Sequence, residues 1–108
     1  MNVLEHEMID LLKVLKNKYG VFEIKAEYEN EGSRQTELMR LKDVAEKTNL
    51  PIIVKIGGVE AVTDIYNALS LGVKGIIAPM AETAFATSKF LNAIDTFVPE
   101  DNQKDIEW

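Results

Sequence analysis

Two short segments of the chain place charged side chains among the apolar residues expected of buried strands. Residues 21–27 run Val-Phe-Glu-Ile-Lys-Ala-Glu, and residues 52–56 run Ile-Ile-Val-Lys-Ile. Side chains alternate between the two faces of a strand, so Lys25 and Glu27 share one face of the first segment. Lys55 lies on the less apolar face of the second. Because a buried charge is costly unless it is paired, such residues mark either a functional site or a structural ion-pair network.

Glu27 and Lys55 are the candidate catalytic residues, because both lie near the C-terminal end of an expected strand. Active sites of parallel α/β barrels are built at that end of the strands. The alternative is a purely structural role on an open sheet, and the sequence favours neither interpretation. Glu29 and Glu31 follow in a polar loop, where most such charges are solvated.

The run Lys55-Ile56-Gly57-Gly58 is a second candidate site, for substrate binding. Gly57 and Gly58 lie between a strand and a helix, where backbone N–H groups at the positive helix end can bind an anion. Double glycines also occur in any tight strand-to-helix turn, and that interpretation carries more weight. Glu60, expected in the first helical turn, would compete with an anionic ligand.

Glu82 is the third candidate and is assigned to substrate binding. It lies between Pro79, which closes an expected strand, and Thr83, which can cap the following helix. Its carboxylate could serve as a ligand or as an acid/base group. A carboxylate beside a helix N-terminus also stabilises the helix by itself, so this simpler role stays open.

The elements that position these residues follow from a hydrophobic pattern that switches between the helical period and short apolar runs. We expect one domain of 108 residues, with a helix in 1–19, three βα units in 20–98 and a polar tail in 99–108. Strand–helix alternation with short loops predicts parallel strands and right-handed crossovers. The predicted fold is therefore α/β, a partial TIM barrel. The last residues, 105–108, have no turn or cap, and we interpret them as a cut.

Expectations also follow for individual side chains. Phe22, Ile24 and Ala26 should pack against helices, because they share the apolar face of the first strand. Ser33 is a candidate N-cap of the second helix, and Gly72 a C-terminal cap of the third. The expected buried stripes of the first, third and fourth helices are Leu4, Met8, Leu11, Leu12 and Leu15; Val62, Ile65, Tyr66 and Leu69; and Ala86, Phe90, Ala93, Ile94 and Phe97.

The composition limits the classes of function. The net charge is −6, with basic residues interleaved among acidic ones, which argues against a nucleic-acid partner. The chain has no cysteine, so disulfides and thiolate chemistry are excluded. Its start lacks a signal-peptide pattern, and no apolar run reaches the roughly 18 residues that span a membrane. We therefore expect a cytoplasmic protein with no membrane partner.

Three segments resemble motifs of a known family. Residues 25–32, Lys-Ala-Glu-Tyr-Glu-Asn-Glu-Gly, are similar to a strand ending in Asp-x-Glu-His, and residues 53–56, Ile-Val-Lys-Ile, to a Val-Val-Arg strand. Residues 71–83 resemble a run that ends in Pro-Met-Val-Glu-Thr, the most specific of the three. Across about residues 20–97 the chain thus resembles the HpcH/HpaI aldolase and citrate-lyase β-subunit family, whose members are TIM barrels of the phosphoenolpyruvate/pyruvate type.

By this resemblance, Glu27, Lys55 and Glu82 would line a pocket for a keto acid or another carboxylate substrate. The family cleaves or forms carbon–carbon bonds through an enolate stabilised by Mg²⁺, a Lewis acid. Lys25, Tyr28 and Lys55 stand where the family has an aspartate, an acid/base histidine and a substrate-binding arginine. Lysine lacks the two-pronged grip of arginine on a carboxylate. The family's Mg²⁺ ligands come from later strands, so we expect no metal site or cofactor in this chain and no activity of the isolated piece.

Three functions stay open. The first is a fragment of a carbon–carbon lyase. The second is a non-catalytic α/β module that self-associates through the unpaired edges of its sheet. The third is a small domain that binds an anion or phosphate at Gly57-Gly58. The expected partner is either a second copy, in a homo-oligomer, or the remainder of a barrel, because three parallel strands alone are incompletely covered.

Overall fold

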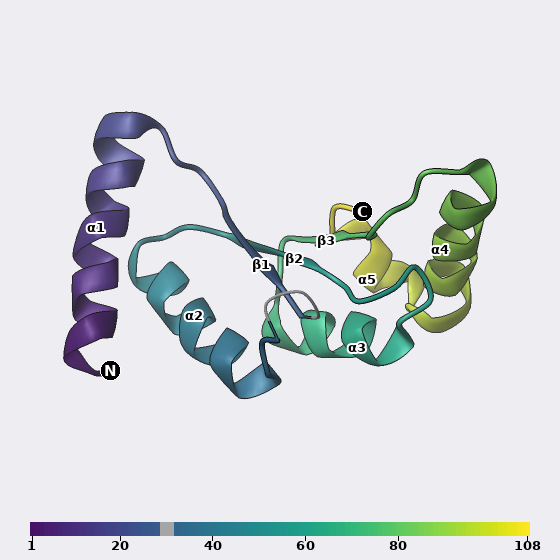
Figure 1. The fold of residues 1–108 in the computed structure, drawn as a ribbon, viewed down its shortest axis with the longest axis horizontal. Helices are drawn as coiled ribbons and strands as arrows, with labels where there is room; N and C mark the ends of the chain where they lie inside the picture. Colours follow the sequence, from purple (N-terminus) through teal and green to yellow (C-terminus); the bar gives the residue numbers. More distant parts are fainter. Residues whose placement is uncertain (29–31) are drawn as a thin grey trace.

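The computed structural model describes residues 1–28 and 32–108 and has a mixed α/β fold (Figure 1). Its three short strands form one parallel sheet in the order β1-β2-β3. The predicted α/β class and the parallel pairing are confirmed. The elements are α1 Val3–Tyr19, β1 Ile24–Glu27, α2 Gln35–Lys47, β2 Ile52–Lys55, α3 Val62–Leu71, β3 Gly75–Ile77, α4 Ala84–Phe97 and α5 Glu100–Lys104.

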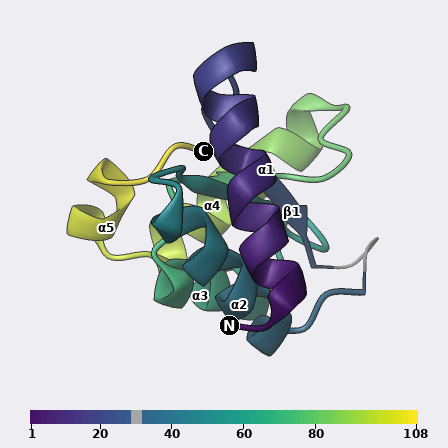
Figure 2. The same ribbon diagram turned by 90° about the vertical axis from the view of Figure 1, so that its left-hand side faces the viewer.

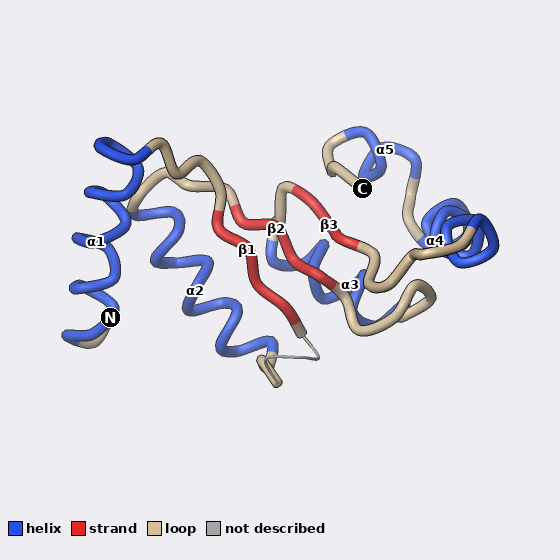
Figure 3. Tube along the Cα trace, turned by 45° about the horizontal axis from the view of Figure 1, so that its top comes forward, coloured by secondary structure: helices blue, strands red, loops and turns tan. Residues whose placement is uncertain are grey.

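The register of the sheet sorts its residues onto two faces. Glu27 of β1 lies beside Lys55 of β2, and Lys55 lies beside Ile77 of β3. Neighbours in register share a face, so one face carries Lys25, Glu27 and Lys55 together with Ile53 and Ile77. We call this surface the charged face. Helices α2 and α3 lie on the other side of the sheet (Figures 1 and 3).

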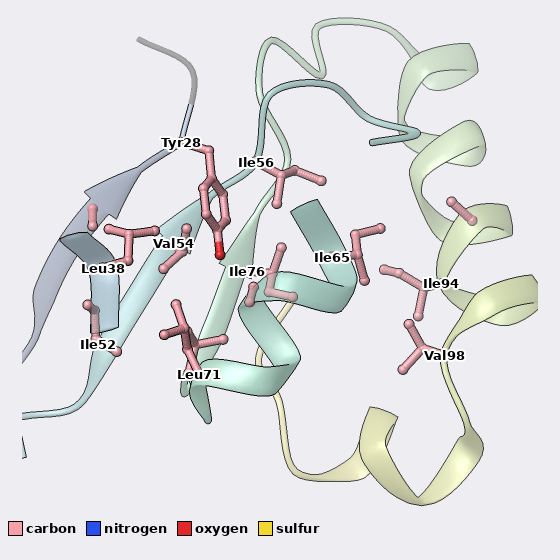
Figure 4. Close-up of a cluster of buried hydrophobic side chains, with 14 of the residues drawn as sticks. Tyr28, Leu38, Ile52, Val54, Ile56, Ile65, Leu71, Ile76, Ile94 and Val98 are labelled. Atoms are coloured by element: carbon pink, nitrogen blue, oxygen red, sulfur yellow. The ribbon is translucent and has the colours of Figure 1, made fainter. Parts of the chain in front are cut away.

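The hydrophobic core fills the space between the sheet and these two helices (Figure 4). Ile52, Val54 and Ile76 point into it from β2 and β3 and are at most 1% exposed. Leu38 of α2 and Ile65 of α3 belong to the same cluster. Each fully buried aliphatic side chain of this kind stabilises the fold by about 1.5–3 kcal/mol. The sheet that carries the charged face is therefore held in place by the core packed against its opposite face.

Helix α1 has well-formed ends. The Asn2 side chain accepts a hydrogen bond from the Glu5 N–H at 2.8 Å, and the Glu5 carboxylate accepts one from the Asn2 N–H at 2.9 Å. This reciprocal pair is a capping box. The helix ends at Gly20, whose left-handed φ of 76° suits a residue without Cβ. Although α1 is the longest helix, no helix in the described part of the chain has the length and apolarity needed to cross a membrane.

The expected buried stripe of α1 is wrong for three of its members. Leu4 and Leu11 are each 64% exposed and Leu15 is 40% exposed, whereas Ile9 is buried. The sequence places apolar residues on two sides of this helix, and α2 covers the side on which Ile9 lies. Periodicity alone could not choose between the two sides.

Three aromatic residues expected in the core are also exposed. Phe22 is 72% exposed and lies outside β1, which begins at Ile24. Tyr66 and Phe97 are 48% and 43% exposed, whereas Ile65 in α3 and Ile94 in α4 are buried. The α4 stripe is otherwise buried as expected at Phe90, Ala93 and Ile94, whereas α3 also buries Ala68 and Leu71, which the predicted stripe did not include.

Two of the three predicted helix caps are present. The Thr83 hydroxyl accepts a hydrogen bond from the Ala86 N–H at 3.1 Å, and Gly72 ends α3 with a φ of 69°. Ser33 is not an N-cap, because α2 begins one residue later than expected, after Arg34. There the side chain of Glu37 accepts the hydrogen bond of the Arg34 N–H at 3.0 Å.

Residues 99–108 are more than a polar tail. They form α5 and then return to the sheet, where Glu107 makes a parallel bridge with Gly75. The Glu107 N–H donates to the Lys74 carbonyl at 2.9 Å, and the Ile76 N–H donates to the Glu107 carbonyl at 2.8 Å. The segment thus continues the parallel pairing beyond β3, which the polar composition of the tail did not indicate.

Candidate functional site

A carboxylate held between two lysines occupies the charged face. Glu27, the last residue of β1, contacts Lys55, the last residue of β2, with 3.1 Å between Oε2 and Nζ. Its Oε1 forms an ion pair with Lys25, two residues earlier on the same strand. The side chain of Glu27 is 10% exposed and that of Lys55 is 23% exposed. The structure therefore brings the two candidate catalytic residues into contact at the C-terminal ends of neighbouring strands.

The two lysines lower the pKa of Glu27 below its ordinary value of 4.5. The hydrogen bond from Lys25 contributes most, followed by that from Lys55, while partial burial of the carboxyl acts in the opposite direction. Glu27 is therefore ionised at neutral pH. A carboxyl with a lowered pKa is a poor proton donor and a weak base near pH 7, so this environment favours a positioning role.

An open cavity of about 380 Å³ adjoins Lys55. It lies at the C-terminal ends of β2 and β3, and its lining includes Gly57 and Gly58 after β2 and Pro79 and Met80 after β3. Lys55 is the charged residue of this lining. The structure thus gathers one predicted catalytic residue and two predicted substrate-binding residues around one cavity, within the usual size range of small-molecule sites, about 300–1,000 Å³.

The backbone amide of Gly57, in the double glycine, already has a hydrogen-bond partner within the chain. The Gly57 N–H donates to Oδ2 of Asp64 at 2.7 Å, so this amide has an anionic partner within the chain. Helix α3 begins only at Val62, after a turn closed by a hydrogen bond from the Ala61 N–H to the Gly58 carbonyl at 3.1 Å. The glycines therefore do not lead directly into the helix. Both observations disfavour an anion site built on the Gly57 amide, because Asp64 would repel the ligand.

Glu82 does not line the cavity beside Lys55. It is exposed in the loop before α4, and its N–H donates to the carbonyl of Met80 at 2.9 Å. Met80 adopts a left-handed φ of 45°, which bends the chain sharply between the cavity and Glu82. Glu60 is likewise exposed and forms an ion pair with Lys89 at 3.1 Å. The grouping of Glu82 with Lys55 therefore has no support from the geometry.

The side chain of Tyr28 belongs to the hydrophobic core on the helix side of the sheet (Figure 4). Its hydroxyl donates to Oε1 of Gln35 at 2.8 Å. Burial, and to a smaller extent the negative charge of Asp64, raise the pKa of Tyr28 to about 12. Tyr28 is thus neutral and packed into the core, on the opposite side of the sheet from the charged face.

The described residues do not fit a magnesium ion. Residues 1–28 and 32–108 hold no group of three His, Cys, Asp or Glu side chains that could bind a metal. Mg²⁺ takes oxygen ligands, and both carboxylate oxygens of Glu27 already contact lysines. Glu29 and Glu31, expected to be solvated loop charges, lie outside the described residues.

Asp64 is the residue of this region that the sequence analysis missed. Its position in the first turn of α3, seven residues after Gly57, is that of an ordinary helix-stabilising carboxylate. An acidic residue soon after a glycine turn was the available signal, since such a side chain can fold back onto the turn amides.

Comparison of the chain with known protein families finds no matching family, and no curated protein or solved structure matches it.

Proposed function

We propose that this chain binds a small carboxylate or α-keto acid at Lys55, as the substrate-binding part of a carbon–carbon lyase with a TIM-barrel plan. One observation carries the proposal. Among the described residues, two ammonium groups, Lys25 and Lys55, share the carboxylate of Glu27, so this group has an excess positive charge beside an open cavity. An anion in the cavity would balance that charge.

Lys55 has the chemistry that this role needs. An ammonium has three N–H donors, and the contact with Glu27 Oε2 uses one of them. Glu27 holds the ammonium in place, and a ligand carboxylate in the cavity would accept hydrogen bonds from the remaining donors. Lysine provides a point charge rather than the two-pronged contact of arginine, so we expect weak binding with little discrimination among small carboxylates.

The charged face would correspond to the inner face of a barrel sheet. Helices α2 and α3 cover the opposite face, as the outer helices of a TIM barrel do (Figure 3). Parallel sheets are normally buried on both faces, so further strands or a second copy would be expected to enclose Lys25, Glu27 and Lys55. Glu107, which pairs with Gly75 beyond β3, extends the sheet in the direction that such closure requires.

The proposal assigns substrate binding and orientation to these residues and no bond-breaking step. The described residues do not fit Mg²⁺, and the lowered pKa of Glu27 makes it a poor acid/base catalyst near neutral pH. Lys55 binds the substrate carboxylate, Glu27 positions Lys55, and Gly57 and Gly58 leave room for the ligand.

An NMR titration of the ¹⁵N-labelled chain tests the proposal. We expect pyruvate and oxaloacetate to shift the amide signals of Lys55, Gly57, Gly58 and Met80 in a saturable way. The Lys55→Ala variant should bind at least about tenfold more weakly, which corresponds to ~1.4 kcal/mol. Lys13→Ala removes an exposed lysine of α1, at a distance from the cavity, and serves as the matched control.

Inorganic phosphate and acetate distinguish the ligand class. Equal shifts with phosphate and pyruvate would indicate a general anion site, the third function considered from the sequence. Shifts that persist unchanged in Lys55→Ala, or that map to other surfaces, would contradict the proposed site.

A further inference from the structure

Contacts with α2 and the residues after it fix the rotation of α1 about its own axis. Ile9 is buried, and the Glu5 carboxylate forms an ion pair with Arg40 of α2 at 2.6 Å. At the other end of the helix, the Lys16 ammonium donates to the carbonyls of Thr48 and Asn49 at 3.1 and 3.2 Å. These contacts determine which side of α1 faces away from the chain.

The outward side of α1 is apolar. Leu4, Leu11 and Leu15 are 64%, 64% and 40% exposed, and Val14 is 44% exposed. A helix on the surface of a globular protein normally has one apolar stripe, facing the core. A second apolar stripe on the outer side is typical of a surface that takes part in an interaction. Figure 2 shows this side of α1 open along its length.

One row of residues along the outward side carries opposite charges at its two ends. Glu7, Leu11, Val14 and Lys18 are spaced i, i+4, i+7 and i+11, so they line one side of the helix. All four are exposed. The row begins with a negative charge and ends with a positive one, about 16 Å apart at the rise of an α-helix, with two apolar residues between them.

This row is complementary to itself when two copies run in opposite directions. In this antiparallel arrangement, Glu7 of each copy lies opposite Lys18 of the other. Leu11 and Val14 of the two copies then face one another in the middle of the contact. A two-fold contact has this property, since residue i touches j and j touches i. A parallel arrangement would instead oppose Glu7 to Glu7 and Lys18 to Lys18, which is repulsive.

We infer that α1 pairs antiparallel with α1 of a second copy of this chain, which makes the protein a two-fold homodimer. The occupant is a second copy because the charge order of the row matches its own reverse. Helix α1 lies at one end of the molecule, whereas the cavity at Lys55 adjoins the loops between β2 and α3 and between β3 and α4 (Figure 1). The dimer leaves the proposed carboxylate site open and does not depend on it.

Light scattering after size exclusion, at several protein concentrations, tests the inference. The wild-type chain should give twice the 12.1 kDa of one chain. Glu7→Lys and Lys18→Glu each turn two attractive contacts into repulsive ones, and each should weaken dimerisation by about tenfold. A variant with both changes, or an equimolar mixture of the two single variants, should dimerise like the wild type, because every contact is again between opposite charges.

Lys13→Glu is the matched control, since it makes the same charge change on α1 outside the row and should leave the dimer intact. Circular dichroism checks that each variant keeps its helices. A wild-type monomer at all concentrations overturns the inference. So does a dimer that Glu7→Lys, Lys18→Glu and Leu11→Asp all leave unchanged, which would locate self-association elsewhere, as at the sheet edges. Loss of dimer in both single variants without recovery in the mixture also overturns it.

Discussion

The carboxylate of Glu27 lies 3.1 Å from the ammonium of Lys55, and this contact ties the C-terminal ends of β1 and β2 together on the charged face. With Lys25 on its other oxygen, Glu27 gains its stabilisation only while it is ionised. The arrangement therefore connects the stability of the fold to pH as well as supplying the charge that we assign to ligand binding.

The first prediction concerns the stability of the fold at acidic pH. The folded-state pKa of Glu27 is lower than its ordinary value of 4.5, so its contribution to stability is complete above that value and is lost as pH falls through the folded-state pKa. Glu27→Gln should lower the melting temperature at neutral pH, and its difference from wild type should shrink below about pH 4. Melting curves between neutral pH and about pH 3 measure this.

Glu60→Gln is the control for this experiment, because Glu60 belongs to an exposed pair with Lys89 and should change the melting temperature little. A difference between Glu27→Gln and wild type that stays constant down to the lowest pH would contradict the role of the ionised carboxylate.

The second prediction compares two adjacent residues of α3. Ile65 is fully buried, whereas Tyr66, expected in the same stripe, is 48% exposed. Ile65→Ala should reduce the free energy of unfolding by about 2–5 kcal/mol, because it leaves a cavity in the core. Tyr66→Ala should cost about 1 kcal/mol or less. Urea denaturation of both variants decides which residue faces the sheet, and equal losses would contradict the orientation of α3.

The contrast between Ile65 and Tyr66 illustrates what the sequence could and could not predict. Alternation within 52–56 predicted the buried and exposed sides of β2, because a strand has only two faces. A helix offers more than one orientation, so the stripes of α1 and α3 were predicted in part wrongly. For α1 the choice depends on where α2 lies, a tertiary fact that local periodicity does not contain.

The candidate site likewise has one feature that the sequence pattern indicates and others that it does not. The closeness of Glu27 and Lys55 follows from strand ends in a parallel sheet, which the sequence pattern indicates. The partner of the Gly57 amide and the exposure of Glu82 depend on loop geometry, on the Asp64 side chain and on the left-handed backbone at Met80. Non-glycine residues adopt such a backbone rarely, so a methionine at this position does not predict it.

The third prediction uses two glycines as a matched pair. Gly72 ends α3 with a φ of 69°, while Gly58 has no positive φ and open space where a Cβ would lie. Gly72→Ala should cost about 1–2 kcal/mol, since a side chain is strained in the left-handed region. Gly58→Ala should leave stability unchanged or raise it by up to about 1 kcal/mol, because it restricts the unfolded chain. Thermal unfolding of both variants measures the difference, and equal effects would contradict the assigned backbone.

The last prediction tests whether residues near the C-terminus belong to the sheet. A Cβ on Gly75 would lie 3.1 Å from Cγ2 of Ile53 and 3.2 Å from the carbonyl oxygen of Glu107, so Gly75→Ala should push the Glu107 segment away from β3. The Ile76 amide, which donates to that carbonyl, should then exchange its hydrogen about tenfold faster, equivalent to ~1.4 kcal/mol of lost local stability. The Tyr28 amide, bonded to Lys55 on the other side of β2, is the internal control and should keep its protection. Equal acceleration at both amides would mean that the substitution destabilises the whole sheet, and no change at Ile76 would mean that Glu107 does not pair with β3 in solution.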